Sequence, residues 1–150
     1  MRGRLELQPL QRQTRPLRTS TNVYGTNPDL SRRVARSADG AVFLVPGDGG
    51  ICMVTTRSET VGGRACVTTG TALRDGLTFT QAATRAGGRR VEGVVPDGVA
   101  RVELSSESES RLLSIDVCDN GFSIGVTSGE ATTLRWLGES NAVMRELPVP

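Results

Sequence analysis

Short apolar runs that alternate with polar residues follow one another along most of the chain. In residues 100–104 the apolar side chains occupy every second position, and residues 113–117 and 122–126 repeat this pattern. Alternation with a period of two is typical of β-strands that bury one face. Further short runs with apolar residues, which are candidates for strands, lie at residues 41–45, 51–55, 77–81, 91–95, 132–137 and 142–147.

Turn-forming residues separate these runs. A Gly-rich loop is expected at residues 46–50, Pro96-Asp97-Gly98 combines a fixed proline φ with a permissive glycine, and Asp119-Asn120-Gly121 contains the hairpin signal Asn-Gly. Such signals recur about every 8–12 residues, which is typical of sandwiches and barrels. The sequence therefore predicts an all-β fold, a single antiparallel sandwich or barrel-like meander of about seven or eight short strands.

Helical turns are expected at two places. Residues 69–75 suit one turn, with Thr69 or Thr71 as the N-cap and Gly76 at its end. Residues 28–34 suit either a turn capped by Asn27 or a loop that enters the first strand. No segment offers ten or more residues with helical periodicity, which disfavours a βαβ arrangement.

Charge divides the chain into two parts. Residues 1–37 carry eight Arg against two acids, whereas the remainder carries ten Arg against fourteen acids. We interpret residues 1–36 as a disordered or extended Arg-rich leader and residues 37–150 as a single β domain. The leader is a candidate for binding nucleic acid or an anionic surface. We favour codon bias in a high-GC genome instead, because its Arg residues have no aromatic partners and no amphipathic spacing, so there is no strong nucleic-acid signal.

The chain contains neither Lys nor His, and all 18 basic residues are Arg. This composition excludes Ser-His-Asp and Cys-His nucleophile pairs, Schiff-base chemistry and imidazole metal ligands. The acidic turn around Asp116 and Asp119 does not match the spacing of a calcium loop. We therefore predict no catalytic residues, no cofactor and no metal site, with a small carboxylate-dependent hydrolase as the alternative.

Three cysteines bear on the cellular compartment. Cys52 and Cys66 each lie in an apolar run and flank one loop, so we predict a disulfide between them, with two buried thiols as the alternative. A bond of this span would contribute about 3 kcal/mol and imply an oxidising compartment. Cys118 is predicted to be a free thiol. The pair favours an extracytoplasmic location, whereas a true start at Met1 favours the cytoplasm, and no apolar run is long enough for a transmembrane segment.

Several motifs recur together in a known group of proteins. Residues 45–54 (VPGDGGICMV), Cys66, residues 93–102 (GVVPDGVARV) and residues 119–122 (DNGF) follow in this order. Together they resemble small, uncharacterised β-rich proteins of high-GC actinobacteria, over about residues 30–126. The resemblance implies a fold and a taxon, and no activity. Such relatives often carry an N-terminal membrane or export segment, a pattern from which residues 1–20 depart.

These patterns favour a non-enzymatic interaction or accessory domain that acts at or outside the cell envelope on a protein partner of unknown identity. Hairpin tips on rigid strands are the best candidates for its binding surface, because a scaffold positions such loops well. We therefore expect binding residues at Asp97, Gly98, Asp119 and Asn120. The oligomeric state is left open.

Overall fold

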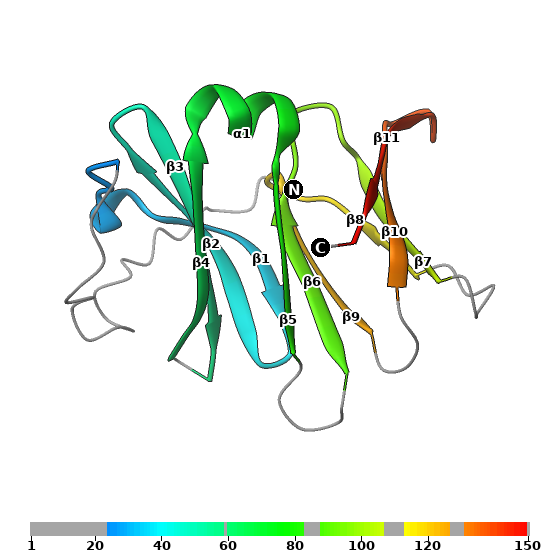
Figure 1. Cartoon of the computed structure of the whole chain (residues 1–150), viewed down its shortest axis with the longest axis horizontal. Coiled ribbons are helices and arrows are strands. Elements are labelled where there is room, and N and C mark those ends of the chain that lie inside the picture. Colours follow the sequence, from blue (N-terminus) through cyan, green and yellow to red (C-terminus); the bar gives the residue numbers. More distant parts are fainter. Residues whose placement is uncertain (1–23, 59, 83–87, 107–112, 127–130, 150) are drawn as a thin grey trace, which may run out of the picture.

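The computed structural model describes residues 24–58, 60–82, 88–106, 113–126 and 131–149 (Figure 1). Within these residues the chain forms eleven strands, one α-helix and a short 3-10 helix. Every strand pair is antiparallel, and the strands form three sheets. The predicted all-β antiparallel fold is therefore confirmed, with more strands than the seven or eight expected.

The first sheet is a meander of four consecutive strands in the order β1-β2-β3-β4. Its strands are β1 (Arg32–Ser37), β2 (Gly40–Gly47), β3 (Gly50–Arg57) and β4 (Thr60–Thr68). The turn between β2 and β3 contains just Asp48 and Gly49, shorter than the expected five-residue loop, and Gly49 has a positive φ of 72°. Glycine adopts this backbone conformation without a steric penalty.

The second sheet lies between the other two in Figure 1, and its strand order is β5-β6-β9. Its strands are β5 (Leu77–Ala82), β6 (Arg89–Val94) and β9 (Gly121–Val126). The third sheet has the order β11-β10-β7-β8. Its strands are β7 (Arg101–Ser106), β8 (Leu113–Asp116), β10 (Ala131–Leu137) and β11 (Val143–Pro148).

The second sheet is packed on both faces. One face joins the third sheet in the largest core cluster, which includes Phe122, Leu134 and Trp136. The other face meets the first sheet through Val94, which packs with Val34, Val42 and Met53. Since successive side chains of a strand point to opposite faces, β6 supplies Val91 to one core and Val94 to the other.

The short helix α1 (Thr69–Asp75) connects β4 of the first sheet to β5 of the second (Figure 1). Its N-cap is Thr68, whose side chain accepts a hydrogen bond from the Thr71 backbone N–H at 3.2 Å. Neither of the expected caps, Thr69 or Thr71, is therefore the N-cap. Gly76 ends the helix with a φ of 62°, as predicted.

The N-terminal boundary of the β domain differs from the expectation. Residues 32–36 lie in β1, an edge strand of the first sheet, although they were assigned to the leader. The 3-10 helix (Pro28–Leu30) precedes this strand, and Asn27 caps it by accepting a hydrogen bond from the Asp29 backbone N–H. The sequence pattern did not indicate β1, because the strand contains several Arg residues and has one buried side chain, Val34. The rest of the leader, residues 1–23, lies outside the described residues.

In the part of the chain that the structure describes, no helix is long and apolar enough to cross a membrane.

The first and second sheets meet most closely where β9 begins beside β1. A Cβ atom added to Gly121 would lie 2.6 Å from the backbone carbonyl carbon and the Cβ of Val34. Real side chains do not approach backbone this closely, so any other residue at Gly121 must push the two sheets apart. Gly125, on the same strand, has open space at its Cβ position.

We expect Gly121→Ala to lower the free energy of unfolding by about 1–3 kcal/mol, the usual cost of overpacking. The control variant Gly125→Ala should stay within about 0.5 kcal/mol of the wild type. Urea unfolding of both variants measures the difference. Equal midpoints for Gly121→Ala and the wild type would show that the two sheets do not rely on this contact.

Candidate functional site

Two turns that were expected to be hairpin tips meet in the structure, although each connects strands of different sheets and neither is a hairpin. The Asn120 side-chain amide donates to Oδ1 of Asp97 at 2.9 Å and to the Val95 carbonyl at 3.2 Å. The backbone N–H of Val95 donates back to the Asn120 carbonyl at 2.8 Å. Residues 25 positions apart in the chain are therefore held as one polar corner above the ends of β6 and β9.

Local sequence explains this corner. Asp119 and Asn120 both have positive φ, at 56° and 63°, as the central residues of a type I′ turn require. This turn centre lies one residue earlier than the Asn-Gly signal indicates, so Gly121 is free to begin β9 against Val34. Gly98 has a φ of 90°, which is the conformation that the third residue of a type II turn requires.

The corner borders an apolar pocket of about 160 Å³ between the first and second sheets. Its walls come from β2, β3 and β4 on one side, from β5 and the end of β6 on the other, and from α1. Leu73 of α1 lines the pocket with its side chain 63% exposed, which extends the apolar surface outward. The residues that line the pocket are Arg32, Leu44, Ile51, Val67, Ala72, Leu73, Leu77, Val94, Val95, Pro96, Asp97 and Asn120.

The four predicted tip residues differ in their relation to this pocket. Asp97 and Asn120 line it, and both are accessible. Asp119 does not line it, but its backbone carbonyl accepts a hydrogen bond from Arg32 at 3.4 Å. Gly98 is exposed in the same turn as Asp97 and faces the Met144 methyl group.

Sequence reasoning did not find Arg32 and Leu73, which complete the pocket. Arg32 was assigned to the leader, and its place in the register of β1, opposite Leu44, puts it beside the pocket wall. Leu73 lies in a helical turn too short to show periodicity. An exposed leucine in an otherwise polar turn is a weak signal, and no pattern in the sequence distinguishes it from a buried one.

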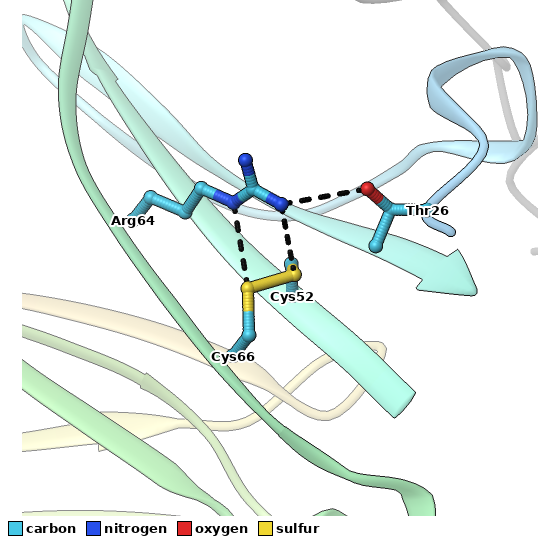
Figure 2. The surroundings of a disulfide bond; sticks show 4 residues. All are labelled: Thr26, Cys52, Arg64 and Cys66. Carbon is cyan, nitrogen blue, oxygen red and sulfur yellow. Dashed lines mark hydrogen bonds between the residues drawn. A yellow bond between two sulfur atoms is a disulfide. The ribbon is translucent and has the colours of Figure 1, made fainter. Parts of the chain in front are cut away.

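The predicted disulfide is present between Cys52 and Cys66, which are directly paired on β3 and β4 with their Cα atoms 4.1 Å apart (Figure 2). Cys52 is buried in a small apolar cluster on the face of the first sheet that lies away from the second. Their neighbours Ile51 and Val67, also paired, face the pocket. The bond therefore fixes the register of one pocket wall from behind.

Arg64 lies over this disulfide, as Figure 2 shows. Its Nε donates to Cys66 Sγ at 3.4 Å, and Nη2 approaches Cys52 Sγ and Thr26 Oγ1 at 3.5 Å each. Thr26 precedes β1, so the guanidinium connects the beginning of the described chain to the disulfide. Sulfur is a weak acceptor, and the planar guanidinium also covers the bond from solvent.

Cys118 is the free, exposed thiol that was predicted. It pairs with Gly121 in an isolated bridge that closes the turn at Asp119 and Asn120. Since the chain lacks His and Lys, no side chain of the usual kind stands ready to activate it. Within the described residues no three His, Cys, Asp or Glu side chains are grouped as a metal site requires.

The other end of the gap between the two sheets is polar. Glu92 is 1% exposed and accepts a hydrogen bond from the Ser123 hydroxyl at 3.1 Å. Arg90 donates to Ser123 at 3.3 Å and pairs with Asp39 at 2.6 Å. Burial works against ionisation of Asp39, but Arg90 and the Ser37 hydroxyl outweigh it and hold the pKa of this carboxyl below its usual range.

Asp39 and Asp75 lack a property that a general acid requires. A general acid needs a raised pKa, whereas the pKa shifts resolved at Asp39 and Asp75 are both downward. The pKa of Asp75 is lowered by hydrogen bonds from Arg74 and then Arg145. Asp97 is the one carboxylate among the described residues that line the pocket.

No protein-family model, curated protein or solved structure matches the chain significantly. The resemblance to small actinobacterial β-rich proteins stays a prediction. The structure is an antiparallel β domain with an apolar pocket where two of its sheets meet.

The disulfide predicts a distinct labelling pattern. Alkylation of the denatured, non-reduced protein should label Cys118 alone, and prior reduction should expose all three thiols to the reagent, as read by intact mass. Reduction should also lower the free energy of unfolding by about 3 kcal/mol, since the bond joins two cysteines separated by 14 positions in the sequence. Equal labelling of the three cysteines without reductant would refute the bond.

Asp39 predicts how stability depends on pH. The pKa of Asp39 is lower in the folded chain than in the unfolded chain, where it is about 3.9. The ionised carboxylate therefore contributes fully to the free energy of unfolding above the unfolded-state pKa. This contribution is lost as the pH falls through the folded-state pKa. The stability difference between the wild type and Asp39→Asn should therefore shrink below about pH 4. Asp116→Asn is the control, because that carboxylate is 78% exposed and its ion pair contributes little. A difference that is constant from pH 7 to pH 3 would contradict the assignment.

Proposed function

We propose that the protein is a non-enzymatic interaction domain that binds an apolar side chain of a partner polypeptide in the pocket between its first and second sheets. The observation that carries this proposal is the junction itself, where an apolar cavity is bordered by two tips whose polar groups are held by hydrogen bonds. Sites of recognition commonly combine an apolar cavity with a few fixed polar groups.

The size of the pocket supports a side chain as its occupant. Small-molecule sites usually enclose about 300–1,000 Å³, whereas an apolar cavity of about 150 Å³ holds one benzene molecule. The pocket of about 160 Å³ therefore suits a single apolar side chain. Anchoring of a few apolar side chains in pockets is also how protein interfaces obtain most of their affinity.

The disulfide supports a location at or outside the cell envelope. Bonds of this kind persist in oxidising compartments and are rare in the cytosol. Here the disulfide joins the two strands next to the Ile51–Val67 pair, on the sheet face opposite the pocket, so it constrains the pocket wall. A binding domain that must keep its shape outside the cell gains from such a constraint.

Selection from a synthetic library of short peptides with free ends, read by mass spectrometry, tests the proposal. We expect the protein to retain peptides that share an apolar residue, and Leu73→Ser to reduce their retention at least fivefold. Leu30→Ser is the matched control, because Leu30 is 59% exposed and does not line the pocket. Peptides retained equally by both variants would place binding elsewhere.

A further inference from the structure

Arg32 gives the pocket a positive charge. It lies half-buried on β1, opposite Leu44, and both residues line the pocket. Five arginines of the described chain form ion pairs, at Arg74, Arg90, Arg101, Arg135 and Arg145. Among the described residues Arg32 forms no ion pair, and its side chain donates a hydrogen bond to the Asp119 carbonyl at 3.4 Å. A guanidinium has five N–H donors, so most of its capacity remains.

The turn at Asp119 and Asn120 places an acceptor near this donor. Arg32 contacts the carbonyl of Asp119, and the next residue, Asn120, holds the Asp97 carboxylate. Asp97 is exposed, and a carboxylate accepts more hydrogen bonds than the one that Asn120 donates. The pocket is therefore bordered by a cationic donor and an anionic acceptor, both held by one two-residue turn.

Three kinds of group thus surround the pocket: an apolar wall, a guanidinium and a carboxylate. The last residue of a polypeptide presents the matching three from a single Cα atom, namely its side chain, its terminal carboxylate and its backbone N–H. We propose that the pocket recognises the C-terminal residue of a partner chain, with an apolar side chain in the cavity, the carboxylate on Arg32 and the backbone N–H on Asp97. This inference rests on the proposed function and names its ligand.

The charge and the surface beyond the cavity argue against the other occupants. An apolar internal residue of a partner has no carboxylate of its own to pair with Arg32. A free amino acid would fill the cavity but leave the adjacent Leu73 side chain, 63% exposed, uncovered. A polypeptide continues past its last residue, and its preceding residues can cover Leu73.

The test compares two probes on the full chain, acetyl-Gly-Gly-Leu with a free carboxylate and the same peptide with a C-terminal amide. Binding is measured by NMR titration at low ionic strength, because charge-assisted contacts weaken with salt. We expect the carboxylate to bind at least 10-fold more tightly than the amide, which is about 1.4 kcal/mol. Arg32→Gln should remove this preference.

Arg33→Gln is the matched control. Arg33 is the next residue of β1 and pairs with Phe43, so its side chain points to the opposite face of the sheet, away from the pocket. It should preserve the preference for the carboxylate. Thermal unfolding of both variants checks that they fold. Asp97→Asn, which neutralises the carboxylate, should weaken the binding of both probes, since each has the same backbone N–H.

Each remaining outcome overturns the inference in a recognisable way. Equal binding of both probes, still sensitive to Leu73→Ser, would refute the C-terminal carboxylate while leaving the proposed function standing. Free L-leucine binding more tightly than the carboxylate peptide would make the occupant a free amino acid. Failure of both probes, together with peptide retention that is insensitive to Leu73→Ser, would remove the pocket as a binding site and the proposed function with it.

Discussion

The close approach of Gly121 to Val34 is the constraint on which the rest of this structure depends. It brings β9 of the second sheet against β1 of the first at a distance that excludes a Cβ atom. The turn before Gly121 is thereby placed beside Arg32. The turn after β6 is held next to it, because Val95 and Asn120 exchange hydrogen bonds. A wider separation would fill the gap with solvent and dissociate the charged groups from the apolar wall. The absence of one side chain thus determines both the packing of the sheets and the shape of the pocket.

The gap between these sheets has different chemistry at its two ends, and β6 explains why. Val94 faces the first sheet in the apolar cluster, and on the same face, two and four residues earlier, stand Glu92 and Arg90. The buried Glu92 is hydrogen-bonded to Ser123, and Arg90 pairs with Asp39, so this end is closed by polar contacts. Buried polar groups need such partners, because leaving them unsatisfied is costly. At the opposite end the hydrogen-bonded groups of Asp97 and Asn120 are accessible, and there the pocket opens.

Local patterns in the sequence predicted much of this molecule, and contacts between distant segments account for what they missed. The period of two at residues 100–104 and 122–126 predicted strands correctly, and the turn residues placed turns at Asp97 and Asn120. These turns are not hairpins as expected, because each connects strands of the second and third sheets. That these turns meet depends on the pairing of β6 with β9, which are separated in the sequence by β7 and β8, and no local pattern reveals this contact. β1 escaped detection because its Arg residues outweigh Val34. Strand β4 was missed for a similar reason, since Gly62, Gly63 and Arg64 interrupt its apolar positions.

The exclusive use of Arg acquires a second meaning at the pocket. Composition alone does not determine which face of β1 each Arg occupies. Arg32 and Arg33 are adjacent, and alternation along the strand directs one toward the cavity and the other away from it. At the cavity a guanidinium differs from an ammonium, because its planar fork pairs with a carboxylate through two parallel hydrogen bonds. The same composition that removes nucleophilic and Schiff-base catalysis therefore leaves the chain well suited to recognising an anionic group next to an apolar one.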